Sequence, residues 1–162
     1  MEIKVLDNAI MDLTMATGYN KTQIEDLINE YQKQNDGLPN LEMIVYGKAH
    51  LLFTKYCPLK KYNLCGKCKE NQYVIKDEYG QFPILSHKDC TTTILNGKIL
   101  NLIDELETIN NIQSFRIQLT LESKEESIEI INRFKDKLKN NNKTYYFNKE
   151  TDTRGHFNRE IQ

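Results

Sequence analysis

The four cysteines of the chain lie in one stretch, and their spacing is the strongest chemical signal in the sequence. Cys65 and Cys68 form a C-x-x-C pair with a glycine inside, which permits the tight turn by which two sulfurs face one ion. Cys57 and Cys90 lie on either side, where a chain that folds back can complete a set of four thiolates. We therefore predict a single metal site whose ligands are Cys57, Cys65, Cys68 and Cys90.

Two other interpretations of the cysteines are open, namely two disulfides or four reduced thiols in the core. Disulfides need an oxidising compartment, and the start Met1-Glu2-Ile3-Lys4 has neither the basic residues nor the apolar stretch of a secretory leader. The clustering argues against dispersed use in a core. No apolar run approaches the ~20 residues that span a bilayer. We expect a cytoplasmic protein that does not cross a membrane.

Thiolates are soft ligands, so four of them select zinc or an iron–sulfur cluster over magnesium or calcium. Zinc takes a closed tetrahedron of sulfurs and contributes folding energy directly. A [4Fe-4S] cluster accepts the same ligands but needs more room and protection from oxygen. The short C-G-K-C segment is typical of a structural zinc site. We predict zinc, and the cluster is the alternative.

The region around the cysteines is basic, although the net charge of the whole chain is only −1. Between residues 48 and 69 there is no acid, and there are six lysines: Lys48, Lys55, Lys60, Lys61, Lys67 and Lys69. Four thiolates on a divalent ion leave about two negative charges, which nearby ammonium groups offset. We interpret the lysines in this way, and a surface that contacts RNA phosphates is the alternative.

Histidine and arginine supply the other candidates for chemistry. His87 precedes Cys90 by three residues and is a possible substitute for one thiolate. His50 follows a predicted strand, and Arg154 and His156 lie together near the end of the chain, where they suit an anion or a carbonyl group. The sequence contains no Ser-His-Asp order, no H-E-x-x-H and no Gly-rich phosphate loop. The catalytic candidates are therefore His50, Arg154 and His156, with no recognisable nucleophile.

The first part of the chain predicts strand, helix and strand. Residues 10–15 are apolar and mixed, as in a buried strand. Asn20 and Gln23 have the spacing of a helix cap. The helix that follows presents one apolar face, made of Ile24, Leu27, Ile28 and Tyr31. Residues 35–39 end it, and residues 41–46 form a strand stopped by Gly47.

The second part predicts a hairpin and then further strands and helices. Residues 72–76 and 82–85 are strand-like and flank a turn at 77–80, which would carry Cys90 toward Cys65 and Cys68. Residues 91–95 and 114–121 read as strands. A helix is indicated by Leu100, Ile103, Leu106 and Ile109. Ser123 and Glu126 form a capping box for a last helix. Its core face is predicted to contain Ile128, Ile131, Phe134 and Leu138.

Outside the cysteine region strands and helices alternate, which indicates an α/β architecture with parallel strands. Several blocks in this order resemble the peptidase U32 family, the collagenase-like proteases. The blocks, which span residues from about 10 to 160, are 41–47, 56–59, 65–68, 93–96, 114–117 and 153–157. The resemblance implies the last strands of a TIM-type barrel with the cysteine loop inserted at its mouth, and a protease or hydrolase activity.

Three or four strands do not close a barrel of eight, so we expect an incomplete TIM-barrel-like set of parallel strands and helices with an inserted cysteine-rich metal-binding hairpin. We place this α/β domain at 1–140, the insert at 57–90 and an irregular tail at 141–162. The resemblance further implies a U32-like partner subunit or self-association, since open strand edges are normally covered. It also implies, as an alternative, a role in iron–sulfur-dependent hydroxylation of RNA or quinones.

Overall fold

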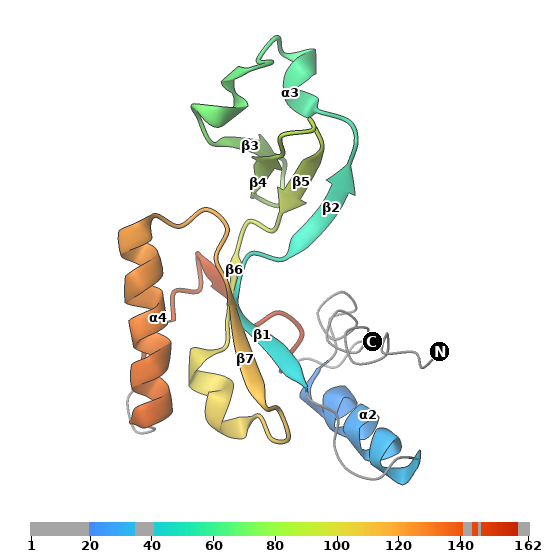
Figure 1. Cartoon of the computed structure of the whole chain (residues 1–162), viewed down its shortest axis with the longest axis vertical. Helices are drawn as coiled ribbons and strands as arrows, with labels where there is room; N and C mark the ends of the chain where they lie inside the picture. Colours follow the sequence, from blue (N-terminus) through green and yellow to red (C-terminus); the bar gives the residue numbers. More distant parts are fainter. Residues whose placement is uncertain (1–19, 35–40, 141–143, 146, 159–162) are drawn as a thin grey trace. The chain divides into compact units, whose positions relative to one another are not determined.

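The computed structural model of the chain describes residues 20–34, 41–140, 144–145 and 147–158 (Figure 1). The predicted strand at 10–15 and the predicted loop at 35–39 lie outside these residues. The described chain divides into two compact units. The terminal unit contains the residues up to Gly47 and those from Leu100 onward, and the central unit is Lys48–Ile99.

The terminal unit is built on a four-stranded sheet in the order β7-β1-β6-β8. Strand β1 pairs with β7 in parallel and with β6 antiparallel. The strands of this sheet are β1 (Glu42–Gly47), β6 (Ile99–Asn101), β7 (Ser114–Gln118) and β8 (Asp152–Thr153). The helices of the unit are α2 (Lys21–Gln34), the 3₁₀ helix η2 (Ile103–Thr108) and α4 (Lys124–Lys139).

The central unit is built on a second sheet in the order β2-β5-β4-β3, in which every pair is antiparallel. The strands are β2 (His50–Thr54), β3 (Tyr73–Lys76), β4 (Gln81–Ser86) and β5 (Thr92–Leu95). The long connection from β2 to β3 contains α3 (Pro58–Lys61) and the 3₁₀ helix η1 (Lys67–Lys69). The unit is longer than the predicted insert at 57–90.

The fold is mixed α/β, but the prediction of a barrel-like set of parallel strands is not confirmed. Among the described residues, β1–β7 is the parallel pair, the other registered pairs are antiparallel, and no barrel closes. The reason lies in the connections. A parallel pair needs a crossover of a dozen or more residues, whereas the turn at 77–80 is short and joins β3 to β4 as a hairpin. This hairpin forms as predicted, and its role in metal binding stays a prediction.

Helix α2 begins where the sequence predicts. The side chain of Asn20 accepts a hydrogen bond from the backbone N–H of Gln23 (2.9 Å), and the side chain of Gln23 accepts one from the N–H of Asn20 (3.0 Å). Two of the four free N–H groups at the helix start are thus satisfied. Ile24 and Ile28 are buried, and they hold the apolar face of the helix against the terminal unit.

Helix α4 also begins at its predicted cap, since both hydrogen bonds of the Ser123–Glu126 capping box are present. Its predicted core face is wrong in part. Phe134 is buried, but Ile128 and Leu138 are 50% and 55% exposed, and Lys137 is buried instead. The buried positions 134 and 137 are three residues apart, so the face turned to the sheet is rotated from the one that the apolar residues mark.

The helix predicted from Leu100 to Ile109 is also corrected. Leu100 lies in β6, opposite Gly47 of β1, and η2 begins only at Ile103. The backbone N–H of Leu102 bonds the carbonyl of Val45 at 2.9 Å, which continues the pairing for one more residue. Cross-strand bonds therefore replace the first helical turn, and the apolar spacing marks a strand followed by a 3₁₀ helix, in which Ile103 and Leu106 are buried.

Candidate metal centre

Cys57 is the N-cap residue of α3 and follows the end of β2 by three residues. Pro58 occupies the first helical position, where its fixed backbone angle and missing N–H do no harm. The side chain of Cys57 makes no capping hydrogen bond, although its carbonyl accepts from the N–H of Lys60 at 3.2 Å. The sulfur is therefore left for another interaction.

The turn after α3 positions the C-x-x-C pair. Asn63 has a positive φ of 56°, its N–H bonds the carbonyl of Lys60 (3.2 Å), and the N–H of Leu64 bonds the carbonyl of Leu59 (3.0 Å). These are the two hydrogen bonds of a Schellman motif, with asparagine in the left-handed position that it tolerates. The chain reverses here, so Cys65 begins a new direction immediately after the helix.

Gly66 then turns the chain a second time. It has a φ of 85° and caps η1, the 3₁₀ helix that contains Cys68. A Cβ at this position would meet no atom within 4 Å, so the requirement for glycine is conformational rather than spatial. Cys65 is exposed and Cys68 is partly buried. This turn is the local structure that the C-G-K-C spacing predicts for two neighbouring ligands.

Cys90 lies in the loop that joins β4 to β5. The N–H of Cys90 bonds the carbonyl of His87 (3.1 Å), and the N–H of His87 bonds the carbonyl of Thr91 (2.9 Å). This is a three-residue hairpin loop whose last residue must adopt the left-handed conformation that normally selects glycine. Cys90 adopts it with a φ of 63°. The side chain of Asp89 supports the loop by accepting hydrogen bonds from the N–H and hydroxyl of Thr91 (3.1 and 2.7 Å).

Strand directions bring all four cysteine-bearing segments to one end of the central sheet. Thr54, at the end of β2, pairs with Thr92 at the start of β5, and Thr92 pairs with Ser86 at the end of β4. The start of β3 lies next to the end of β4, because Tyr73 pairs with Ile84. The β2–β3 connection and the β4–β5 loop therefore leave the sheet at the same end, where Figure 1 shows α3.

The sulfurs themselves are not gathered. Within the part of the chain that the structure describes, no group of three or more His, Cys, Asp or Glu side chains is arranged to hold a metal ion. At this end of the sheet the hydroxyl of Thr92 is fully buried and has no hydrogen-bond partner, which is a costly state for a polar group. The donor set suits a soft metal ion, and binding requires the loops to close.

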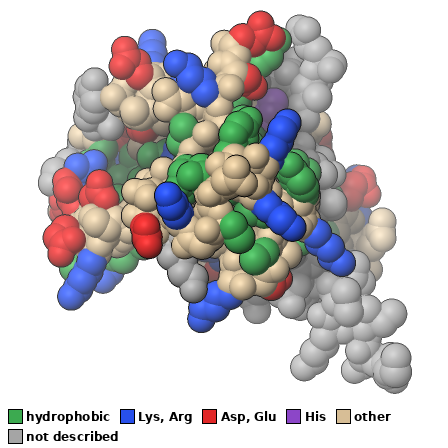
Figure 2. Space-filling view, turned by 90° about the horizontal axis from the view of Figure 1, so that it is seen from above, with side chains coloured by type: hydrophobic (Ala, Val, Ile, Leu, Met, Phe, Trp, Pro, Cys, Tyr) green, Lys and Arg blue, Asp and Glu red, His purple; other side chains and the backbone are tan. Residues whose placement is uncertain are grey.

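Seen from above, Lys and Arg side chains lie beside hydrophobic ones, a class that includes tyrosine (Figure 2). Lys55, Lys60, Lys61 and Lys67 are exposed, and none of them makes an ion pair with the described residues. Lys48 differs, since its Nζ donates to the carbonyl of Gly97 at 2.5 Å and so ties together the two ends of the central unit. Tyr56 and Tyr62 are 59% and 69% exposed within the same segment.

One histidine of the central unit lies in the β4–β5 loop and the other lies on β2. His87 is hydrogen-bonded through Nε2 to the hydroxyl of Thr93 (2.8 Å), and its ring lies 6.1 Å from that of Phe53. Its side chain is thus already bound to β5. His50 is the first residue of β2, pairs with Leu95 and is exposed.

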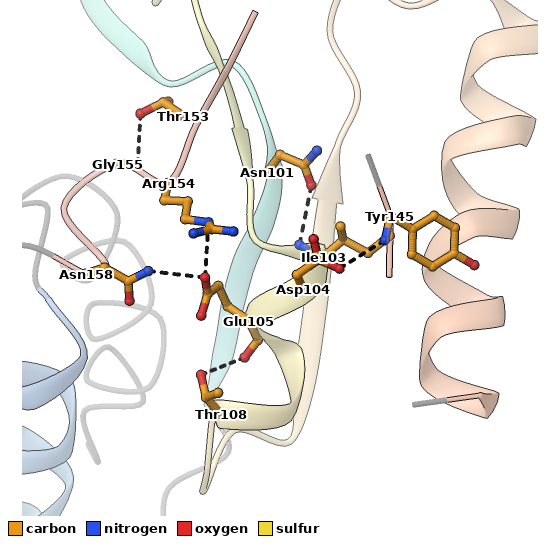
Figure 3. A network of polar contacts seen from close by, with 10 residues as sticks. All are labelled: Asn101, Ile103, Asp104, Glu105, Thr108, Tyr145, Thr153, Arg154, Gly155 and Asn158. Atoms are coloured by element: carbon orange, nitrogen blue, oxygen red, sulfur yellow. Dashed lines mark hydrogen bonds and ion pairs between the residues drawn. The ribbon is translucent and has the colours of Figure 1, made fainter. Parts of the chain in front are cut away.

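Arg154 has a structural contact in the terminal unit (Figure 3). Its Nε lies 3.0 Å from a carboxylate oxygen of Glu105, and its guanidinium carbon lies 4.9 Å from the centre of the Phe147 ring. The same oxygen of Glu105 accepts from Asn158 at 3.2 Å. These contacts fasten the last described segment to η2. His156 lies in the turn that follows and is exposed.

Sequence reasoning missed a cavity in the terminal unit. It has a volume of about 210 Å³ and lies among β1, β6, β8 and α4, with Tyr46, Asn101, Phe134 and Asp152 in its wall. In the sequence Tyr46 is only the last residue of an apolar strand. Nothing in the local pattern shows that its neighbours in space come from residues 101 and 152.

No protein-family model, curated protein or solved structure matches the chain. Among the described residues, no helix is long and apolar enough to span a membrane.

Proposed function

We propose that the central unit is a metal-binding module in which Cys57, Cys65, Cys68 and Cys90 supply four thiolates to one ion, with zinc as the metal and a [4Fe-4S] cluster as the alternative. The observation that supports this most is the topology. The four cysteines lie in two connections, β2–β3 and β4–β5, and both connections start from the same end of one antiparallel sheet. In this proposal the metal acts as a structural element, because it joins loops that bury little apolar surface on their own.

The local geometry supports the same proposal. Gly66 and Asn63 place two left-handed turns around the C-x-x-C pair, and Cys90 adopts a third in place of glycine. A non-glycine residue in this conformation costs about 1–2 kcal/mol, so its presence suggests that the thiol at position 90 has a use. A bound metal would supply the loops with stability that the apolar core does not.

The test is elemental analysis of the purified chain together with an absorption spectrum recorded after anaerobic purification. We expect about one zinc per chain and a colourless protein, or about four irons and broad brown absorbance if a cluster is native. Cys65→Ser and Cys68→Ser should each lose the metal and lower hydrogen-exchange protection at 57–90, while the terminal unit keeps its protection.

His87→Ala is the matched control, because His87 is a potential metal ligand that the proposal leaves out. It should keep the metal. Absence of both metals together with four freely titratable thiols would contradict the proposal. Loss of metal in His87→Ala but not in the cysteine variants would show that the proposed set of ligands is wrong.

A second candidate function is contact with RNA. It is favoured by the exposed lysines of the segment 55–67 and by the exposed rings of Tyr56 and Tyr62, since cationic side chains attract phosphates and exposed aromatic rings stack on unpaired bases. Fluorescence anisotropy with a single-stranded oligonucleotide tests it. Binding should weaken steeply with salt, and Tyr62→Ala should weaken it about tenfold. Tyr79→Ala, at an even more exposed tyrosine of the β3–β4 turn, should not weaken it.

The interpretation as a U32-type protease or hydrolase, and the predicted partner subunit or self-association, stay proposals that rest on sequence blocks. Strand β2 supports the association. It is an edge strand, and Leu51, Leu52 and Phe53 are 53%, 51% and 62% exposed. Measurement of molar mass in solution tests this point, and a monomer with peptidase turnover would favour the enzyme instead.

A further inference from the structure

The cavity of the terminal unit lies in a row of three neighbouring strands. Tyr46 of β1 is directly opposite Asn101 of β6, so the two side chains project from the same face of the sheet. The side-chain nitrogen of Asn101 donates to a carboxylate oxygen of Asp152 in β8 (2.9 Å). This face of the sheet is covered by α4, where the ring of Phe134 meets the Tyr46 ring edge-on with centroids 5.9 Å apart.

The hydroxyl of Tyr46 is a polar group of this wall that has no partner among the described residues. The residue is only 8% exposed and lines the cavity, yet its hydroxyl makes no hydrogen bond with the described residues. Other polar groups in the wall are occupied. Asp152 accepts from Asn101 and Thr151, and the hydroxyl of Tyr145 donates to Asp136 at 3.0 Å. A hydroxyl that lines a space larger than one water needs, and that no described residue bonds, can bind a polar ligand atom.

The charges around this hydroxyl decide the sign of the ligand. Burial and the carboxylates of Glu122 and Asp152 raise the pKa of Tyr46 to about 12. Glu126 acts in the same direction, and among the causes of the shift Arg133 alone opposes it. Arg133 is moreover paired with Glu129 on its own helix. Arg133 also lines the cavity, but three carboxylates act on the hydroxyl against this one guanidinium, and that balance favours a cation over an anion.

The N-terminus of α4, where free backbone N–H groups would attract a phosphate or a carboxylate, is also occupied. Ser123 and Glu126 occupy these groups through the capping box, and Glu122 accepts hydrogen bonds from the N–H groups of Thr120 and Leu121 (2.6 and 3.0 Å). The protein's own carboxylates thus hold the positions where an anionic ligand would bind.

We propose that this cavity binds a small protonated amine, whose ammonium group donates to the hydroxyl oxygen of Tyr46 beside Asp152 and whose apolar body packs against Phe134 and Ile103. An ammonium group supplies the donor that the Tyr46 oxygen lacks and the positive charge that the carboxylates favour. The aromatic and aliphatic wall suits a short carbon chain. This site belongs to the terminal unit alone and does not depend on the proposed metal centre.

The test uses the full chain and three probes with the same four-carbon skeleton, namely n-butylammonium, butyrate and 1-butanol. Amide chemical shifts in two-dimensional NMR follow each titration. We expect saturable shifts at Tyr46, Asn101 and Asp152 with butylammonium, at about millimolar dissociation constant for so small a ligand. Butanol should bind about tenfold more weakly and butyrate more weakly still. Equal affinity for butyrate and butylammonium, or shifts confined to other residues, would overturn the proposal.

Tyr46→Phe removes only the hydroxyl. It should weaken butylammonium binding about tenfold, because a hydrogen bond to a charged group is lost, and it should not lower the melting temperature, because the hydroxyl has no partner in the free protein. The matched control is Tyr79→Phe, because Tyr79 lies in the central unit and is 84% exposed. This variant should change neither the affinity for butylammonium nor the melting temperature. A folded Tyr46→Phe protein with unchanged affinity would contradict the proposal. If this variant does not fold, the comparison of the three probes on the original chain decides.

Discussion

The Nζ atom of Lys137 lies 2.6 Å from a carboxylate oxygen of Glu107, and the lysine side chain is 7% exposed. The contact joins α4 to the end of η2, through two residues that are 30 positions apart along the chain. An ammonium group so deeply buried is stable only when it is paired, so this contact holds the helix in its rotated position. It explains why a lysine, rather than Leu138, turns to the core.

We expect Glu107→Ala to lower the free energy of unfolding by about 2 kcal/mol, because the buried ammonium group loses this carboxylate. Glu129→Ala is the control. It breaks the ion pair between Glu129 and Arg133, whose side chains are 62% and 52% exposed, and should cost less than about 1 kcal/mol. Urea unfolding measures both values. Equal losses in the two variants would show that the burial of Lys137 has no energetic weight.

Cys90→Gly should act in opposite directions with and without metal. In the metal-free, reduced protein it should raise the free energy of unfolding of the central unit by about 1 kcal/mol, since glycine adopts a φ of 63° without strain. Cys90→Ala keeps the strain and should not. Both variants should lose metal affinity if Cys90 is a ligand. Denaturation in the presence of a chelator and a reductant gives the first value, and the same stability for both variants would contradict it.

Gly47→Ala should prevent the pairing of β1 with β7. A Cβ at this position would lie 2.3 Å from the carbonyl oxygen of Gln118, and the φ of 133° is unfavourable for any other residue. We expect a loss of more than about 3 kcal/mol, or no folded terminal unit at all. Gly66→Ala, where a Cβ meets only open space, should cost about 1 kcal/mol. Circular dichroism and urea unfolding compare the two, and a mild effect at Gly47 would refute the close approach.

Tyr46 should make stability fall at alkaline pH. Its pKa is raised from 10.0 to about 12 in the folded protein, so the folded state holds this proton more tightly than the unfolded state does. The resulting stabilisation is fully present below pH 10 and is lost as the pH rises toward 12. The slope of unfolding free energy against pH in this window should be smaller for Tyr46→Phe than for the original chain. Identical slopes would show that the phenol is not buried in the folded state.

Local signals in the sequence were sufficient for the helix starts and for one hairpin. Asn20 with Gln23, and Ser123 with Glu126, act within four residues of one another, so their geometry depends little on the rest of the fold. The hairpin at 73–86 depends on a turn in which the carboxylate of Asp77 accepts hydrogen bonds from the N–H groups of Tyr79 and Gly80 (2.8 and 3.0 Å). Contacts of this kind are determined by the few residues that form them, so the local sequence predicts them.

Features that depend on distant partners were not predictable in this way. Leu100 reads as the start of a helix, but the edge of β1 supplies hydrogen bonds that make it a strand residue. Ile128 and Leu138 have helical spacing and still face outward, because η2 with Glu107 selects another side of α4. The cysteine positions were visible at once, whereas their common end of the sheet follows only from strand directions that the spacing does not contain.

Strands β1 and β7 are paired although about 70 residues separate them, and the central unit occupies most of that interval. The N–H of Asn96 bonds the carbonyl of Ala49 at 2.8 Å, so the polypeptide enters and leaves this unit at one place. Once the unit has formed, the loop that β1 and β7 must close is several-fold shorter in effect, which saves about 1 kcal/mol of chain entropy. Refolding of the outer strands should therefore depend on the inserted sheet, and we expect a ligand that stabilises this sheet to accelerate their pairing when the sheet forms first.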